Sequence, residues 1–331
     1  MKMIVCGTRP EIIKLYPVIK ELKNAYVVLT GQHDELANQM IKDFKIKVDE
    51  NLKVMTKDQS LTSLTIKLHQ GLSEIYERKK PELVIVQGDT TSAMVASLEA
   101  YYHKIPVAHV EAGLRTYDNY APFPEEMNRR IITQIAKYNF APTRKAFYAS
   151  IMQGSGDVYE VGQTGIDTLF EFAKKIKVKK QKKLLVTLHR RENYENIYEI
   201  TNKIAKFLNK HLDWKAVMPL HPNPVIKKAI LTSSIMNMNI FVKPLGYFDM
   251  IREMKESSLI VTDSGGIQEE ASALKVPVYV ARTTTERPEG IEEGFARLLG
   301  EEIEVFEVPN KKNPYGDGRA GKYICKILKN V

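Results

Sequence analysis

Between an apolar run and a helical pattern, residues 262–270 read TDSGGIQEE. The run at 259–261 predicts a buried strand, and 267–274 predicts a helix. Two glycines at a strand-to-helix turn leave backbone N–H groups uncovered at the positive end of the helix, which favours a phosphate. Ser264 can cap this helix, and Glu270, about one turn in, can accept hydrogen bonds from a sugar diol. Diphosphate and ribose together indicate a nucleotide; the alternative is an ordinary Ser-capped helix after a tight turn.

Strand and helix patterns alternate along the whole chain. In the first half, strands are expected at 3–6, 26–29, 83–86, 107–110 and from 157, with helices at 10–23, 91–102 and 124–137. After a lysine-rich stretch at 174–183, strands are expected at 184–188, 215–218, 240–242, 259–261 and 276–280, with helices at 197–208, 248–255 and 267–274. Such alternation predicts an α/β fold with two doubly wound parallel sheets facing a cleft. Ligands of such sheets bind at the carboxyl ends of the strands.

Length and composition narrow the class of protein. The chain has 331 residues, which suits two domains, and no apolar run reaches the roughly 18 residues of a membrane span. Cys6 and Cys325 are the only cysteines, so we expect no disulfide framework and no cysteine metal site. With no signal-peptide pattern at the start, a cytoplasmic protein is expected. The net charge of +9 sits largely in 174–183, which we interpret as a solvated linker rather than a nucleic-acid or membrane patch, since it has no interleaved aromatics.

Carboxylates follow two neighbouring strands of the first expected sheet. The strand at 83–86 leads into Asp89, and the strand at 107–110 leads directly into Glu111. Because these strand ends share one edge, the two side chains suit general acid–base chemistry. Asp89 could instead cap the next helix, whereas Glu111 has no helix to cap. Glu125 and Glu126 open a helix, where acidic residues are ordinary dipole partners, so either could be structural, but the two preceding prolines fix their loop.

Cations and histidines follow strands of both halves. His189 and Arg190 come directly after the strand at 184–188 and could meet a phosphate, and His221 follows another strand. The histidines lack metal-ligand spacing, so no metal site is expected. The first strand ends in Arg9 with Lys14 one turn on, where a dinucleotide-binding enzyme carries G-x-G-x-x-G, so a redox mechanism is not supported.

Eight segments, in order, resemble motifs of the non-hydrolysing UDP-N-acetylglucosamine 2-epimerases. They are GTRPEIIK at 7–14, GDTTS at 88–92, HVEAGLRT at 109–116, PFPEEMNR at 122–129, HRREN at 189–193, TDSGGIQEE at 262–270, TTERPE at 284–289 and NPYGDG at 313–318. The resemblance implies the GT-B fold, two Rossmann-like domains with a cleft between them. It places an N-terminal domain with the catalytic carboxylates at 1–170, a UDP-binding domain at 171–314, and a helix at 315–331 that crosses back to the first.

The resemblance also implies a reaction and its residues. UDP-N-acetylglucosamine (UDP-GlcNAc) and UDP-N-acetylmannosamine (UDP-ManNAc) would be interconverted without cofactor or metal, by elimination of UDP to 2-acetamidoglucal and re-addition. The family's catalytic residues match Asp89, Glu111, Glu125 and His189. Its UDP contacts match Arg9, His221, Ser264, Gly265, Gly266 and Glu270, and cations within the same motifs give the further candidate substrate contacts Lys14, Arg115, Arg190 and Arg287. A cytoplasmic homodimer serving polysaccharide biosynthesis is expected, with no nucleic-acid or membrane partner.

Three other functions compete. A hydrolysing 2-epimerase, which releases free ManNAc and UDP, shares most of these motifs. A GT-B glycosyltransferase using a UDP-sugar would need fewer carboxylates around the sugar. A nucleic-acid-binding protein is suggested by the positive net charge alone.

Overall fold

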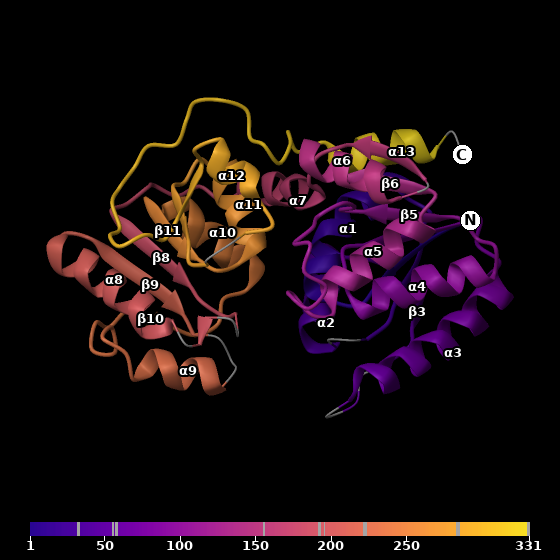
Figure 1. Ribbon diagram of the computed structural model, residues 1–331, viewed down its shortest axis with the longest axis horizontal. Coiled ribbons are helices and arrows are strands. Elements are labelled where there is room, and N and C mark those ends of the chain that lie inside the picture. The colour runs from indigo at the N-terminus through magenta and orange to yellow at the C-terminus, as the bar shows by residue number, and fades with distance from the viewer. Residues whose placement is uncertain are drawn as a thin grey trace. The chain divides into compact units, whose positions relative to one another are not determined.

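The chain forms two compact units, each built on one parallel sheet (Figure 1). The first comprises Met1–Thr168 and Tyr315–Val331, and the second comprises Leu169–Pro314. The structure, a computed structural model, describes residues 1–31, 34–54, 56, 59–154, 156–190, 193–194, 196–220, 224–282 and 285–329. Within these residues no helix is long and apolar enough to cross a membrane.

The first unit contains a seven-stranded parallel sheet in the order β3-β2-β1-β4-β5-β6-β7. Its strands are β1 (Lys2–Cys6), β2 (Tyr26–Leu29), β3 (Glu50–Asn51), β4 (Leu83–Gln87), β5 (Val107–Val110), β6 (Tyr138–Ala141) and β7 (Asp157–Glu160). Its helices are α1 (Arg9–Leu22), α2 (Asp34–Phe44), α3 (Leu61–Lys79), α4 (Thr91–Tyr102), α5 (Glu125–Ile135), α6 (Arg144–Gln153), α7 (Thr164–Ala173), which runs into the second unit, and α13 (Ala320–Leu328). The strand order reverses between β1 and β4, so the loops after these strands border the switch point where ligands of such sheets bind.

Alternating apolar side chains explain this sheet's two covered faces. Met3 and Val5 of β1 pack in one core with Leu64 and Leu68 of α3, all of them buried. Their neighbour Ile4 is also buried, as expected of a central parallel strand covered on both sides. The C-terminal helix α13 packs against α1, where a Cβ on Gly321 would lie 2.7 Å from Cβ of Pro17.

The second unit repeats the plan with a six-stranded parallel sheet in the order β10-β9-β8-β11-β12-β13. Its strands are β8 (Lys183–Thr187), β9 (Lys215–Pro219), β10 (Phe241–Val242), β11 (Leu259–Thr262), β12 (Val278–Val280) and β13 (Ala296–Leu298). Its helices are α8 (Ile197–Lys210), α9 (Pro224–Leu231), α10 (Tyr247–Glu256), α11 (Gly265–Ala273) and α12 (Pro288–Glu292). The order reverses between β8 and β11, whose ends carry the HRREN and TDSGG segments.

The expected α/β fold with two doubly wound sheets is confirmed. The strands expected at 26–29 and 107–110 and the helix at 91–102 have the expected bounds, and residues 174–182 form a connection after α7. One boundary was wrong in an informative way. Helix α11 begins at Gly265 rather than at 267, so both glycines lie in its first turn, where backbone N–H groups have no partner within the helix.

Candidate active site

Glu111 lies directly after β5 and is buried. Its carboxylate accepts hydrogen bonds from Lys14 Nζ of α1, at 2.7 Å and 2.5 Å to its two oxygens, and from Gln87 Nε2 at the end of β4. The backbone φ of Glu111 is +67°, in the left-handed region that is unfavourable for a residue with a Cβ. Such strain persists only where the surroundings enforce it and clusters at functional sites, which supports Glu111 as a site residue.

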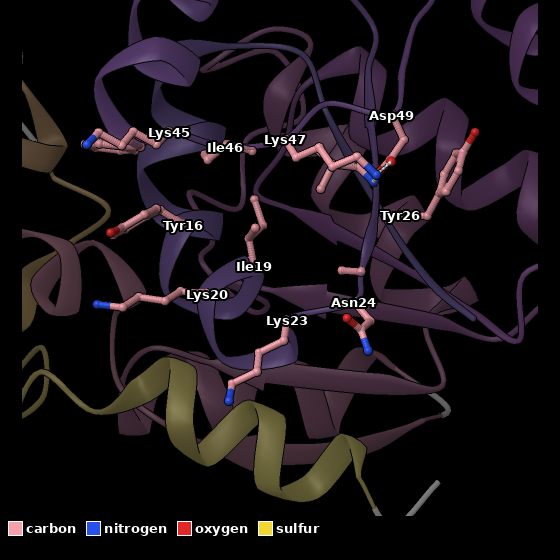
Figure 2. Close-up of a pocket in the computed structure, with 13 residues that line it drawn as sticks. Tyr16, Ile19, Lys20, Lys23, Asn24, Tyr26, Lys45, Ile46, Lys47 and Asp49 are labelled. Carbon is pink, nitrogen blue, oxygen red and sulfur yellow. Dashed lines mark hydrogen bonds and ion pairs between the residues drawn. The ribbon is translucent and has the colours of Figure 1, made fainter.

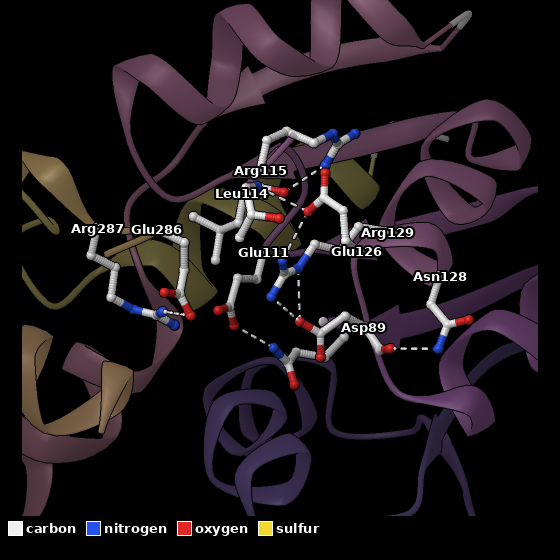
Figure 3. A network of polar contacts seen from close by, with 12 residues as sticks. Asp89, Glu111, Leu114, Arg115, Glu126, Asn128, Arg129, Glu286 and Arg287 are labelled. Carbon is white, nitrogen blue, oxygen red and sulfur yellow. Dashed lines mark hydrogen bonds and ion pairs between the residues drawn. The ribbon is translucent and has the colours of Figure 1, made fainter. Parts of the chain in front are cut away.

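Asp89 lies at the same edge, two residues after β4 ends (Figure 3). Arg129 of α5 donates from Nε to Asp89 Oδ2 at 2.8 Å, and its Nη2 lies 2.6 Å from the same oxygen. The alternative that Asp89 caps α4 is wrong, because the cap is Thr90, whose Oγ1 accepts from the backbone N–H of Ala93 at 3.0 Å. Asp89 is instead held at the sheet edge by a guanidinium, with part of its side chain exposed.

The turn that carries Asp89 is braced from β5 by His109, which is fully buried. His109 Nε2 lies 2.7 Å from the carbonyl oxygen of Gly88. Burial lowers the pKa of His109 to about 4, so the ring is neutral at pH 7 and the nitrogen facing the carbonyl carries the proton. Gly88 has a φ of +72°, which glycine adopts at little cost. His109 thus fixes the backbone next to Asp89.

A buried carboxylate, Glu11, ties the loop after β1 to the loop after β4. It accepts hydrogen bonds from the backbone N–H groups of Gly7 (3.0 Å) and Thr8 (2.7 Å) and from Thr90 Oγ1 (2.8 Å). Burial raises the pKa of Glu11, and these hydrogen bonds act in the opposite direction. The loop so fixed begins α1, which places the half-buried Arg9 and, further along, Lys14 at the edge that holds Glu111.

The first turn of α5 separates two acidic residues that the sequence left undivided. Glu126 is fully buried, accepts hydrogen bonds from the backbone N–H groups of Thr116 (3.0 Å) and Tyr117 (3.3 Å), and pairs with Arg129 and Arg130. Glu125 lies beside it on the helix and is only half-buried. Glu126 is therefore the structural carboxylate of the pair.

Arg115, expected to contact substrate, is instead engaged inside the first unit. It donates from Nη1 to the carbonyl of Leu114 at 2.7 Å (Figure 3). It also donates from Nε to Gln153 Oε1 at 2.6 Å and from Nη2 to Thr133 Oγ1 at 2.9 Å. Burial lowers the pKa of Arg115 to about 10, which leaves it charged at neutral pH. These contacts hold the loop after Glu111 against α5 and α6, so Arg115 supports the site from behind.

In the second unit His189 stands at the carboxyl end of β8, next to Asp263 at the end of β11. His189 Nδ1 lies 3.0 Å from Asp263 Oδ1, and 38% of the imidazole side chain is exposed. The Asp263 carboxylate is fully buried. Burial alone would raise its pKa, but His189 and the backbone N–H groups of His189 and Arg190 outweigh burial and hold the pKa of Asp263 below its usual range.

The start of α11 has the form expected of an anion site. Gly265 and Gly266 occupy its first two positions after Ser264. A Cβ on Gly265 would lie 2.3 Å from Nη1 of Arg287, so the guanidinium lies directly over this glycine, whereas a Cβ on Gly266 would meet nothing within 4 Å. Ser264 stands at the cap position, but its side chain makes no capping hydrogen bond, so the expected cap interaction is absent.

Three arginines surround Glu286 just before α12. Arg282 donates to Glu286 Oε2 at 2.5 Å, and Arg287 Nη1 and Arg190 Nη2 lie 2.9 Å and 3.4 Å from Oε1. Burial would raise the pKa of Glu286, but the arginines, Arg287 foremost, lower it well below its usual range. Arg287 also donates to Glu269 Oε1 of α11 at 2.5 Å. These pairs fix Arg190 and Arg287 beside the start of α11.

Glu270 and His221 are the two remaining predicted nucleotide contacts of the second unit. Glu270 of α11 is half-buried, and Tyr247 Oη of α10 donates to its Oε1 at 3.4 Å. His221 lies outside the described residues. Within the described residues, no three His, Cys, Asp or Glu side chains are arranged to hold a metal ion.

A groove of about 700 Å³ lies elsewhere on the first unit, near the start of β2 and the ends of α1 and α2 (Figure 2). Its rim includes Lys20, Lys23 and Lys45, which lie at or just beyond the last turns of α1 and α2. Cations there offset the partial negative charge of helix C-termini, so this basic rim has a structural explanation. Since β2 begins here, the groove lies at the amino end of a strand, whereas Glu111 lies at the carboxyl ends of the strands, on the opposite side of the sheet.

Five residues of the site were not predicted from the sequence: Gln87, His109, Arg129, Asp263 and Glu286. Asp263 and His109 lie inside quoted motifs, and Asp263 directly follows a strand, as Glu111 does, so its position could have indicated a site residue. Arg129 and Glu286 also lie in quoted motifs, but their contacts with Asp89 and Arg190 join residues far apart in the sequence, which no spacing indicates.

Comparison with known proteins identifies the family of this chain. The family model described as UDP-N-acetylglucosamine 2-epimerase matches residues 20–329. A UDP-N-acetylglucosamine 2-epimerase of Neisseria meningitidis serogroup A is 41% identical over the full length of both chains. The crystal structure of the N. meningitidis enzyme bound to UDP-GlcNAc has a TM-score of 0.89 at 36% identity, covering all of both chains. That of the Methanocaldococcus jannaschii enzyme with UDP-GlcNAc and UDP has a TM-score of 0.87 at 32% identity, again covering all of both chains. The chain therefore belongs to the UDP-N-acetylglucosamine 2-epimerase family.

Proposed function

We propose that this protein interconverts UDP-GlcNAc and UDP-ManNAc by inverting C2 of the sugar. The observation that carries the proposal is the pair of carboxylates at neighbouring strand ends, Asp89 held by Arg129 and Glu111 held by Lys14 on a strained backbone. Family membership over the full length supports the same reaction. The N. meningitidis relative was crystallised with UDP-GlcNAc, the substrate we propose here.

The nucleotide is proposed to bind the second unit. Its diphosphate would accept hydrogen bonds from the backbone N–H groups that begin α11, where Gly266 leaves open space and Arg287 adds positive charge. Arg190, held beside Arg287 through Glu286, suits the same anion. Glu270 would accept hydrogen bonds from the ribose hydroxyls. Ser264, Arg9 and His221 are proposed as further UDP contacts, and Arg9 carries its charge at the first turn of α1.

The chemistry requires two differently placed proton-transfer groups. No carbonyl acidifies the C2 proton, so the C1–O bond to UDP must break as a base removes that proton, leaving a C1=C2 double bond. Reversal with a proton delivered to the opposite face of C2, and UDP returning to C1, gives the epimer. Asp89, Glu111 and Glu125 are proposed to stabilise the cation-like C1 and to exchange these protons, with His189 as a further acid–base group.

Proton NMR of the purified protein with UDP-GlcNAc alone tests the proposal. We expect the anomeric signal of UDP-ManNAc to appear without NAD or a metal salt, and to be abolished in Glu111→Gln. Free ManNAc and UDP as the sole products would instead establish the hydrolysing reaction. If UDP-GlcNAc stays unchanged alone and is consumed only after a sugar acceptor is added, the protein is a glycosyltransferase.

We further propose that the protein acts in the cytoplasm as a homodimer and supplies UDP-ManNAc to polysaccharide synthesis. Dimerisation is supported by apolar side chains on the outer surface of the first unit. Ile66 of α3 and Tyr101 and Tyr102 of α4 are 52%, 62% and 63% exposed, and the Tyr102 ring stacks on His69, one turn along α3 from Ile66. Clustered exposed apolar groups of this kind mark contact surfaces.

A further inference from the structure

We propose that Asp263 is a positioning residue that fixes the tautomer and orientation of the His189 imidazole, so that Nε2 of His189 is the atom presented to the substrate. The inference rests on the proposed function for its catalytic consequence. Its structural part, the tautomer, can be measured without substrate.

The orientation of the Asp263 carboxylate is fixed by donors that cannot reverse their role. The backbone N–H of His189 lies 3.1 Å and 3.0 Å from the two oxygens, the backbone N–H of Arg190 donates to Oδ2 at 2.9 Å, and Asn193 Nδ2 donates to Oδ2 at 3.0 Å. The backbone N–H of Asp263 in turn donates to the carbonyl of Thr187 at 3.2 Å, which joins the ends of β8 and β11. The carboxylate is therefore rigid, and it is buried.

A rigid acceptor next to Nδ1 decides where the imidazole proton lies. His189 Nδ1 is 3.0 Å from Asp263 Oδ1, and an ionised carboxylate can only accept. The neutral ring must then carry its proton on Nδ1, so the lone pair of the ring lies on Nε2. The partly exposed imidazole can reach a ligand, whereas Asp263 cannot, because it is fully buried.

Among the described residues, a second group of charges lies beside this pair, around Arg190. Arg190 follows His189 in the loop after β8, and its guanidinium lies 3.4 Å from Glu286, which Arg282 and Arg287 also contact. Asn193 anchors the same loop a second time by donating to the carbonyl of Ala281 at 2.8 Å. Asn193→Ala therefore serves as a control that loosens the loop and removes one of the donors to Asp263, but keeps both side chains of the Asp263–His189 contact.

Nitrogen NMR of histidine-labelled protein tests the tautomer directly. In the unmodified protein above pH 8 we expect the ¹⁵N shifts and couplings of His189 to report a proton on Nδ1, with assignment from His189→Gln. The Nδ1–H form should persist in Asn193→Ala and be lost in Asp263→Asn. A proton on Nε2 in the unmodified protein would overturn the proposal, whether or not the protein proves to be an epimerase.

Turnover supplies a second test, which a merely structural aspartate would fail. Asp263→Asn should lower kcat by at least about 100-fold, the scale of one acid–base group, with little change in UDP affinity. In a His189→Ala background the same substitution should lower kcat less than about 3-fold further, because residues that act as one unit are non-additive. A full additional loss in that background would show that Asp263 acts independently of His189 and would contradict the proposal.

Discussion

Glu125 and Glu126 are neighbours in the sequence, yet the fold gives them different environments. Glu126 is fully buried and binds two backbone N–H groups and two arginines, whereas Glu125 is half-buried at the start of α5. The sequence could place both in a helical first turn but could not divide them, because their partners come from the loop at 116–117 and from the next turn of α5.

This pair gives a matched test of the proposed chemistry. Glu125→Gln should lower kcat by at least about 100-fold, because it removes a proposed acid–base group, and should lower the melting temperature less than Glu126→Gln does. Glu126→Gln should lower the free energy of unfolding by about 3–5 kcal/mol, the cost of breaking a buried ion pair. Kinetics and thermal melts of both variants decide the matter. Near-normal turnover in Glu125→Gln would remove Glu125 from the catalytic set.

Buried His109 makes a testable contribution to the pH dependence of stability. Its pKa is about 4 in the fold against 6.5 ordinarily, so between these values the unfolded chain binds the extra proton and acid destabilises the fold. Asp167 acts in the opposite sense. Burial raises the pKa of Asp167 to about 6, so its contribution to the free energy of unfolding is lost as the pH rises. The effects of His109 and Asp167 on the pH dependence of stability therefore partly cancel between about pH 4 and 6 in the unmodified protein.

Substitution of His109 by a residue that does not titrate separates the two effects. His109→Gln keeps an N–H that can donate to the Gly88 carbonyl. From about pH 6.5 down to about pH 4, the unmodified protein should lose stability relative to this variant by up to about 1.4 kcal/mol per pH unit. Urea titrations at several pH values measure the difference. Parallel stability curves would show that His109 is not buried as a neutral ring.

Among the elements, helix α11 shows what sequence can and cannot supply. The TDSGG segment predicted a strand, a turn and a helix start, and all three are present. The length of the helix was underestimated, because glycine has low helix propensity and the first turn is stabilised by its surroundings rather than by propensity. The guanidinium of Arg287 over Gly265 could not be predicted, since it depends on the path of the chain after β12.

The two glycines of α11 allow a second matched pair. Gly265→Ala should disturb Arg287 and its pairs with Glu269 and Glu286, and so lower the melting temperature. Gly266→Ala meets no protein atom, so stability should hold within about 1 kcal/mol, the scale of the Gly-to-Ala propensity difference in a helix. Calorimetry with UDP should nevertheless show at least 10-fold weaker binding for Gly266→Ala, about 1.4 kcal/mol, if the diphosphate approaches this backbone. Unchanged affinity in that variant would mean that the phosphate binds elsewhere.

Short or long-range elements were the hardest to predict from sequence. β3 has two residues and β13 three, too few to show a period, so only pairing with β2 and β12 defines them. Helix α3 is different, because Leu64, Leu68 and Leu72 recur at a helical spacing and are buried, and this helix was open to prediction. The parallel sheets themselves followed from the alternation of strand and helix patterns, since that order leaves little other choice.

For the whole molecule, the homodimer is a prediction with a direct measurement. A dimer of two 37.8 kDa chains has a mass near 76 kDa. The double substitution Tyr101→Asp with Tyr102→Asp places charges on the exposed surface of α4 and should shift the mass to that of one chain. Light scattering after size exclusion gives the mass. Leu212→Asp, at an 88% exposed residue of the second unit, is the control and should leave the mass unchanged. A monomeric unmodified protein at working concentration would contradict the dimer.

The central claim is chemistry at C2 of the sugar, and solvent exchange at that carbon tests it most directly. The protein should be incubated with UDP-GlcNAc in deuterated water, without NAD or a metal salt, and followed by proton NMR. Because a proton leaves one face of C2 and another returns from solvent, the C2 proton signals of both UDP-GlcNAc and UDP-ManNAc should disappear as the mixture equilibrates, while Asp89→Asn and Glu111→Gln leave them intact. Formation of UDP-ManNAc that retains its original C2 proton would contradict elimination and re-addition, and no UDP-ManNAc at all would contradict the proposed activity.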